Sequence, residues 1–312
     1  MQNAIWILGG ANIDIVGKSQ HEPRMHDSNI GEISFSFGGV GRNIAEVCSL
    51  FYENVHLASC FSKDAFGQQL ANDCKELGLQ IEDSLWSDTS SSSVYLALLD
   101  ERHDMLYGLN DMRILEEMDD EFILKVLSKI KEDDYLGIDT NMEEARLRKI
   151  AENANTKIFA DPVSVAKCNR IKPILSHLDI FKPNQYEAEE LSGISIQDEQ
   201  SAKEALDYFL KEGVKEIIIS LSEKGALLGT EKEKVWIKIP PLEIENATGG
   251  GDTLLGAYVV KRSQGEEPKE ALRFAMCAAT LRIEAKPNDR RKINEEKVKE
   301  EMKELKLEEV IL

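Results

Sequence analysis

Apolar residues follow two alternating spacings along this chain. Short apolar runs predict strands over residues 4–8, 55–59, 157–160, 179–182 and 216–220. Apolar positions repeating every three or four residues predict helices over 41–52, 66–77 and 199–212, and the last two are followed by glycine, which ends helices. This alternation predicts an α/β fold in which parallel strands are joined by crossover helices on both faces of the sheet.

Two segments depart from this pattern, at about residues 13–37 and 90–110. Both are richer in Ser, Thr and His, and Val94, Leu96 and Leu98 alternate with other residues, as in a strand with one exposed face. We interpret the two segments as a small antiparallel sheet that projects from the core as a lid. The serines at 90–93 form either a flexible loop or the entry to a lid strand.

The rest of the chain gives no sign of a second domain. No low-complexity linker or internal repeat divides residues 1–312, so we expect one domain. The Lys- and Glu-rich stretch 295–309 carries Val298, Met302 and Leu305 on one face, which predicts a solvated terminal helix.

Composition narrows the class of partner. The net charge of −19 argues against nucleic acid and anionic membranes. No segment resembles a signal peptide or a membrane span, and five scattered cysteines without a CxxC pair suggest reduced thiols, so we expect a cytoplasmic protein. The five histidines show no paired spacing and receive no role.

The most informative motif is a run of three glycines, 249–251, followed by Asp252 and an apolar run. Three glycines are entropically costly, which suggests a backbone that must lie against a ligand. Free N–H groups at a helix start bind phosphate. A carboxylate there would repel phosphate unless it had a task, such as taking a proton from a hydroxyl beside a phosphoryl group. The alternative is a glycine-rich turn with an ordinary helix-start Asp.

The loop 246–252 resembles the second signature of the PfkB or ribokinase-like family of sugar and nucleoside kinases. Gly250 stands where that family usually has Ala, and Asn246 where it commonly has Asp. Four more motifs follow the family's order: the opening strand 9–14, Gly-Gly-x-x-x-Asn-x-Ala at 38–45, Asn-x-x-Glu at 184–187, and the nucleotide segment 220–225 with Ser222 in place of Gly. The resemblance spans nearly the whole chain. It implies a three-layer αβα sandwich with a mostly parallel central sheet and a small β-sheet lid.

The resemblance also implies ATP and Mg²⁺ and assigns roles to the matching residues. Asp252 is implied as the general base, and Gly249, Gly250 and Gly251 as N–H donors to the transferring phosphate. The substrate-binding set is Asn12, Asp14, Gly39, Asn43 and Lys167. The ATP-binding set is Asn184, Glu187, Ser220, Ser222, Gly225 and Thr248, with Glu187 also near Mg²⁺ mainly through water. Whether a monovalent cation also binds stays open, because Asn246 stands where the family commonly has Asp.

Each side chain has a plainer alternative. Asp14 would simply begin a turn, and Asn43 would cap or sit within its helix, although Asn is a poor residue for a helix interior. Glu187 would be a charge on a helix face, and Lys167 an ordinary surface lysine.

A narrower resemblance concerns the substrate. The segments 31–46 (GEISFSFGGVGRNIAE), 111–112 and 161–167 (DPVSVAK) resemble the pseudouridine kinase branch, which implies phosphorylation of the 5′-hydroxyl of pseudouridine. The alternatives are a kinase of another nucleoside or of a free sugar such as ribose, and a non-catalytic ligand-binding relative. A base-sized pocket between lid and core would distinguish a pseudouridine kinase from a kinase of another nucleoside or of a free sugar. Lid strands often pair across a dimer in this fold, so a homodimer formed through the lid is a further possibility.

Overall fold

The middle layer of the protein is a nine-stranded sheet, seen in a computed structural model that describes residues 3–241 and 249–312. Its order is β15-β14-β13-β12-β11-β10-β9-β1-β4. The parallel strands are β1 (Ile5–Leu8), β4 (Val55–Ala58), β9 (Tyr135–Asp139), β10 (Lys157–Asp161), β11 (Ile180–Phe181) and β12 (Glu216–Ser220). Antiparallel strands β13 (Ala226–Thr230), β14 (Lys234–Lys238) and β15 (Glu308–Ile311) complete one edge. The expected mostly parallel sheet is confirmed.

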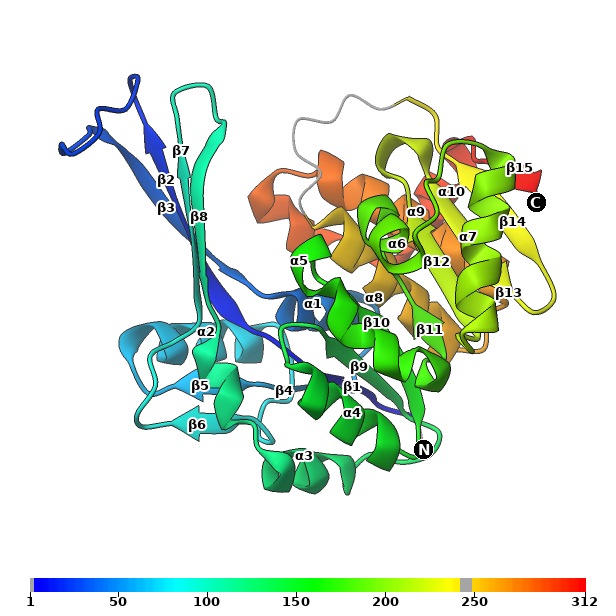
Figure 1. Cartoon of the computed structure of the whole chain (residues 1–312), viewed down its shortest axis with the longest axis horizontal. Helices are drawn as coiled ribbons and strands as arrows, with labels where there is room; N and C mark the ends of the chain where they lie inside the picture. Colours follow the sequence, from blue (N-terminus) through cyan, green and yellow to red (C-terminus); the bar gives the residue numbers. More distant parts are fainter. Residues whose placement is uncertain (1–2, 242–248) are drawn as a thin grey trace.

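Helices cover both faces of this sheet (Figure 1). One face packs against α1 (Val40–Phe51), α2 (Ala65–Glu76), α8 (Gly250–Ser263), α9 (Pro268–Glu284) and α10 (Glu295–Glu304). The other packs against α3 (Asp120–Leu127), α4 (Glu144–Asn153), α5 (Val165–Cys168), α6 (Gln185–Ser192) and α7 (Glu199–Lys211). In β1, Ile5 and Ile7 join the first core while Trp6 and Leu8 join the second, because alternate side chains of a strand point to opposite faces.

Shorter elements connect these layers. They are the strand pair β5 (Cys60–Ser62) and β6 (Leu85–Ser87) and the 3₁₀ segments η1 (Arg113–Glu117), η2 (Asn169–His177), η3 (Ser222–Lys224) and η4 (Pro287–Lys292). Within residues 3–241 and 249–312, we find no helix whose length and apolar character would let it span a bilayer.

Four strands form the lid, which projects from the sandwich (Figure 1). In order they are β3 (Gly31–Gly38), β2 (Asn12–Ser19), β7 (Val94–Leu99) and β8 (Met105–Asp111). The two outer pairs are antiparallel as expected, but β2 and β7 run parallel, so the prediction of a wholly antiparallel lid was wrong. Between β3 and β7 the chain passes back through the core, and such a long crossover returns a strand in the parallel direction.

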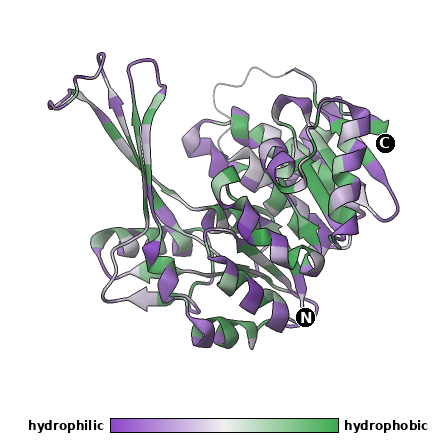
Figure 2. Cartoon of the chain, viewed as in Figure 1, coloured by the Kyte–Doolittle hydropathy of each residue, from purple (hydrophilic) through white to green (hydrophobic). Residues whose placement is uncertain are grey.

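The lid has two chemically different faces. Asp14 pairs with Ser36 and Tyr95 across the strands, which places these side chains on one face. On the opposite face, Phe35 and Leu109 are 61% and 65% exposed. Figure 2 shows apolar segments in the lid strands as well as in the sandwich.

The C-terminal segment differs from expectation. The helix predicted over 295–309 ends at Glu304, and β15 then adds an edge strand to the sheet. Val298 is fully buried, so this helix packs on the core along one face. The glutamates of β15 hide the strand signal, because charged residues are typical of exposed edge strands.

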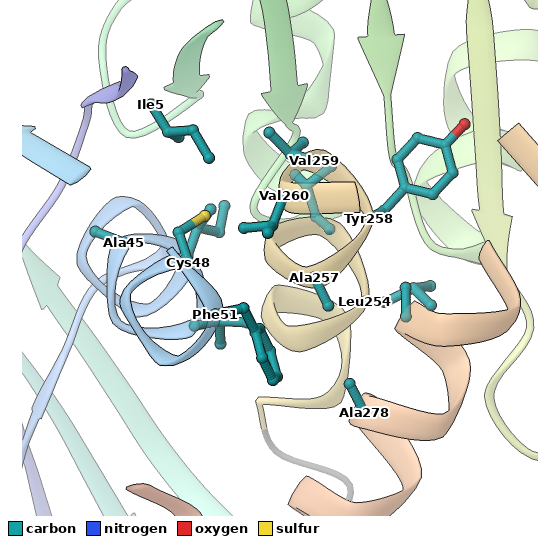
Figure 3. Close-up of a cluster of buried hydrophobic side chains, with 14 of the residues drawn as sticks. Ile5, Ala45, Cys48, Phe51, Leu254, Ala257, Tyr258, Val259, Val260 and Ala278 are labelled. Carbon is teal, nitrogen blue, oxygen red and sulfur yellow. The ribbon is translucent and has the colours of Figure 1, made fainter. Parts of the chain in front are cut away.

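Close packing of α1 on α8 sets the position of the site. A Cβ atom at Gly256 would lie 2.9 Å from Cβ of Val47 and 3.1 Å from the carbonyl oxygen of Ile44. Figure 3 shows Cys48 of α1 facing α8, and its Sγ lies 3.6 Å from the carbonyl oxygen of Gly256. Only glycine permits this approach, which brings the N-terminal turns of both helices together.

Substitution of Gly256 by Val is expected to lower the free energy of unfolding by about 1–3 kcal/mol, because the added atoms overpack the α1–α8 contact. Chemical denaturation measures this change. Ser263→Val, at the end of the same helix, controls for the β-branched residue alone. Equal stabilities of Gly256→Val and the control would contradict the packing argument.

Candidate functional site

The predicted ATP and catalytic residues gather at one cavity beyond the carboxyl ends of the parallel strands, where ligands of α/β sheets usually bind. Its volume is about 680 Å³. The wall residues predicted from sequence are Gly250, Gly251, Asp252, Asn184, Glu187, Ser220, Ser222 and Gly225. Asn246 and Thr248 lie outside the described residues.

The glycine run forms the start of α8. Gly249 is the N-cap with φ +84°, a left-handed conformation that favours glycine, and Gly250 and Gly251 are the first helical residues. The first intrahelical bond runs from the N–H of Thr253 to the carbonyl of Gly249, so the preceding N–H groups point beyond the helix end. This geometry suits an anion.

Asp252 sits in the first turn of α8 and is partly buried. Its Oδ2 accepts a hydrogen bond of 2.9 Å from the side-chain amide of Asn43. Burial and the neighbouring Asp161 raise the pKa of Asp252 to about 6, against the opposing effects of Lys182 and the Asn43 bond. A carboxyl group that titrates near neutrality is suited to accept a proton from a hydroxyl group.

A buried ion pair lies beside this carboxylate. Lys182 Nζ is 2.8 Å from Asp161 Oδ2, and both side chains are almost fully buried. Burial lowers the pKa of Lys182, but the charges of Asp161 and Glu187 outweigh it and hold that pKa above its usual value. A Cβ atom at Gly251 would lie 3.0 Å from the Lys182 ammonium, so this cation borders the anion loop.

Sequence reasoning did not select Lys182 as a site residue. The sequence did contain a signal, since Lys182 directly follows the buried strand Ile180–Phe181. A charge at a buried position must pair with an opposite charge or bind a ligand.

Asn184 and Glu187 have a structural task as well as a place on the cavity. They form a capping box on α6: Asn184 Oδ1 accepts from the Glu187 N–H at 2.9 Å, and Glu187 Oε2 accepts from the Asn184 N–H at 2.8 Å. Burial, followed by the charge of Asp161, raises the pKa of Glu187 to about 7.

These two residues alone do not form a cage for an ion. Across residues 3–241 and 249–312 we find no cluster of three His, Cys, Asp or Glu side chains able to hold a metal. A single carboxylate beside a phosphate pocket still fits Mg²⁺, which keeps most of its ligands as water and phosphate oxygens.

The segment predicted to bind the nucleotide, 220–225, also lines this cavity. Ser222 has φ +52° and Gly225 has φ +92°. The family's usual Gly at position 222 matches this left-handed backbone, which Ser adopts at a cost of about 1 kcal/mol. Ile239, Met276 and Ile283 also line the cavity and offer an apolar wall.

The predicted sugar-binding residues lie around the start of α1. Asn12 donates a 2.6 Å hydrogen bond to Asp14 Oδ1. Burial raises the pKa of Asp14, opposed by the Asn12 bond and the charge of Arg42. Gly39, the N-cap of α1, has φ +96°. Four residues later the helix contains Asn43, whose hydrogen bond to Asp252 joins the predicted sugar-binding residues to the predicted catalytic residue.

The carboxylate that organises this region was missed by sequence reasoning. Asp139 is fully buried at the end of β9, and its Oδ2 accepts hydrogen bonds of 2.9 Å from the N–H groups of Gly10 and Gly41. Cβ atoms at Gly9 and Gly41 would lie 2.6 and 2.9 Å from this oxygen, so these glycines make room for it. The signal in the sequence was an Asp that ends a short apolar run.

A second cavity, of about 260 Å³, lies at the base of the lid, where Asn110 of β8 contributes to a wall otherwise formed outside the lid strands. Lys167 Nζ donates a 2.7 Å hydrogen bond to Asn141 Oδ1, and burial lowers the pKa of this lysine. The lysine is therefore half-buried on a pocket. The lining residues are Asn110, Met112, Arg113, Leu115, Glu116, Asn141, Met142, Glu143, Arg146, Lys167 and Arg170.

The known proteins to which this chain is similar are carbohydrate and nucleoside kinases. The profile of the pfkB family of carbohydrate kinases matches residues 2–288. Pseudouridine kinase of Escherichia coli K12 is 31% identical over 89% of each chain, and ribokinase of Haemophilus influenzae is 25% identical over 92% of this chain and 94% of its own. The structure of Arabidopsis thaliana ribokinase complexed with ribose and ATP superimposes with a TM-score of 0.81 at 20% identity, covering 97% of this chain and 99% of that one.

The fold expected from the sequence motifs is thus confirmed. The chain belongs to the pfkB family of carbohydrate kinases and is a phosphotransferase.

Proposed function

We propose that this enzyme transfers the γ-phosphate of ATP to the 5′-hydroxyl of pseudouridine. The observation that carries the chemistry is Asp252, a partly buried carboxylate at the edge of an N–H-lined helix start. The choice of nucleoside is supported by the second cavity. Two branch-like segments contribute to its wall, through Met112 and Lys167, and the 31% identity to a pseudouridine kinase supports the same choice.

In the proposed reaction Asp252 takes the proton of the sugar hydroxyl as the hydroxyl oxygen attacks the γ-phosphorus, and ADP leaves with the bridging oxygen. The N–H groups at Gly249, Gly250 and Gly251 meet the charge on the transferring phosphoryl oxygens. The Lys182 ammonium adds a fixed positive charge beside them. Positioning and charge neutralisation, which this arrangement offers, provide most of the catalysis in phosphoryl transfer.

ATP occupies the 680 Å³ cavity in this proposal. Its phosphates point to the start of α8, and its base lies against the apolar wall near Ile239 and beside Ser220, Ser222 and Gly225. Glu187, assisted by Asn184, would hold hydrated Mg²⁺. The ion neutralises charge on the phosphates when bound.

The nucleoside lies between lid and core. Asn12, Asp14, Gly39 and Asn43 bind ribose hydroxyls. Lys167 and Asn141, 2.7 Å apart, meet the polar edge of the base. Pseudouridine has an N–H where uridine has a C–H, so a pocket that accepts from this N–H leaves its acceptor unpaired with uridine.

We further infer a homodimer in which lid faces pack together. The exposed apolar side chains of the face opposite Asp14 support this: Ile33, Phe35, Leu98, Tyr107 and Leu109. A sheet face of this kind is unusual on a monomer.

Replacing Phe35 and Leu109 together by Glu is expected to convert a dimer to a monomer in sedimentation velocity. Leu124→Glu, at an exposed leucine of α3 away from the lid, is the control. A wild-type protein that sediments as a monomer, or a double variant that stays dimeric, would contradict the lid interface.

Asp252→Asn is expected to reduce kcat by about two to four orders of magnitude while ATP affinity and the folded state persist, because the proton acceptor is lost. Single-turnover quenched-flow measures the chemical step. Asp120→Asn, also in the first turn of a helix but exposed on α3, is the matched control. Near-normal turnover of Asp252→Asn with chemistry limiting would show that another group is the base.

Pseudouridine is expected to be the best substrate in a coupled ADP-release assay with uridine, adenosine and ribose. Lys167→Met is expected to reduce kcat/KM for pseudouridine by about 5- to 150-fold, the effect of leaving a buried hydrogen-bonding group unpaired. The KM for ATP is expected to stay unchanged.

Lys172→Met, an exposed lysine five residues along the chain, controls for the loss of charge. Equal efficiency with uridine and pseudouridine, or a preference for ribose or adenosine, would assign the enzyme to the alternative substrates.

A further inference from the structure

A cluster of charges, buried except for the exposed Arg291, lies behind the catalytic side of the site. It joins α1, α2, α9 and η4 through Arg42, Glu46, Asp73, Arg282 and Arg291. Arg42 Nη1 is 2.6 Å from Glu46 and its Nη2 is 2.6 Å from Asp73. Arg282 lies 2.6 Å from the other oxygen of Glu46, and Arg291 lies 2.8 Å from Asp73. Three guanidinium groups therefore surround two carboxylates.

Stability alone is a weak explanation for this cluster. Buried ion pairs usually contribute little net stability, because removing the charges from water is costly. Within the described part of the chain, Nε of Arg42 and Nε of Arg282 are buried without a hydrogen-bond partner. An arrangement that leaves donors unpaired suggests a task other than holding helices together.

The cluster touches the active site through one side chain. Arg42 Nη1 donates a 3.0 Å hydrogen bond to Asn43 Oδ1, and Asn43 Nδ2 donates the 2.9 Å bond to Asp252 Oδ2. A carboxamide has one acceptor end and one donor end. Because Arg42 binds the acceptor end, the donor end must face Asp252. The reversed amide would place an oxygen against the carboxylate and repel it.

We propose that Arg42 is a positioning residue for the general base. It fixes the orientation of the Asn43 amide, and the ion pairs with Glu46 and Asp73 fix Arg42 in turn. This inference rests on the proposed role of Asp252 but not on which nucleoside is phosphorylated. It assigns the buried cluster to catalysis although none of its members touches the reacting atoms.

Several charged groups also act on Asp252 and must be kept constant in a test. They are Asp161 from β10, Lys182 after β11, Glu187 from α6 and Arg282 from α9. Asp161 disfavours ionisation of Asp252, whereas Lys182 and Arg282 favour it. Arg42→Lys changes none of these groups and keeps the positive charge, so its effect reports the loss of the amide contact.

Arg42→Lys is expected to move the acidic limb of the pH–kcat profile to higher pH. The reason is that a hydrogen bond to an ionised carboxylate favours the ionised form, and its loss favours the protonated, inactive form. At a pH on the wild-type acidic limb, kcat is expected to fall about tenfold for each unit of displacement and to recover at high pH. The KM for ATP is expected to stay unchanged.

Arg262→Lys is the matched control, because the guanidinium group of Arg262 in α8 is likewise paired with a carboxylate, Glu216, away from the site. Arg42→Gln is the second variant and leaves two guanidinium groups for two carboxylates, so the cluster stays balanced. Circular dichroism and thermal melting identify the folded variants. An unshifted acidic limb in a folded Arg42 variant, or an equal shift in Arg262→Lys, overturns the proposal.

A double-variant cycle tests the route through Asn43. Asn43→Leu is expected to shift the acidic limb in the same direction, and Arg42→Lys is expected to add little further shift in that background. Additive shifts would mean that Arg42 acts by another path and would overturn the proposal. Asp252→Asn is measured alongside: if it stays active the base assignment fails, whereas an inactive Asp252→Asn with an unaffected Arg42→Lys rejects only this inference.

Discussion

The close contact between α1 and α8 is the constraint on which the site depends. Gly256 lets the backbone of α8 approach Val47 and the carbonyl of Ile44, so the first turns of the two helices meet. One turn carries Asn43 and the other carries Asp252, and their side chains form a hydrogen bond. In the proposed reaction this hydrogen bond joins the sugar-binding residues to the general base.

Two carboxylates at the ends of neighbouring strands support this junction. Asp139 of β9 binds the N–H groups of Gly10 and Gly41, which fixes the start of α1 and the entry to the lid. Asp161 of β10 pairs with Lys182, which places a cation beside the first turn of α8. Buried charges therefore lie together at the carboxyl ends of the parallel strands, where desolvation strengthens their interactions.

Those parts of the fold and the candidate site that depend on short sequence patterns were predictable from the sequence. The glycine run before Asp252, the Asn184–Glu187 pair and the alternation in the lid depend on neighbours along the chain. Strand β9 was missed because its apolar run is short and contains Gly137, and that glycine is explained only by the Phe159 ring packed over it from β10. Lys182, Asp139 and the Arg42 cluster acquire their roles from partners that are distant in sequence.

The central claim is that the partly buried carboxyl group of Asp252 is poised near neutral pH to accept a proton. Carbon-13 NMR of protein labelled at the aspartate side-chain carboxyl carbons, with Asp252→Asn to assign the resonance, measures its titration directly. The account predicts a midpoint of about 6, well above the ordinary value, with the ionised, proton-accepting form above that pH and the protonated form below it. A midpoint at or below the usual aspartate value of about 4 would contradict it.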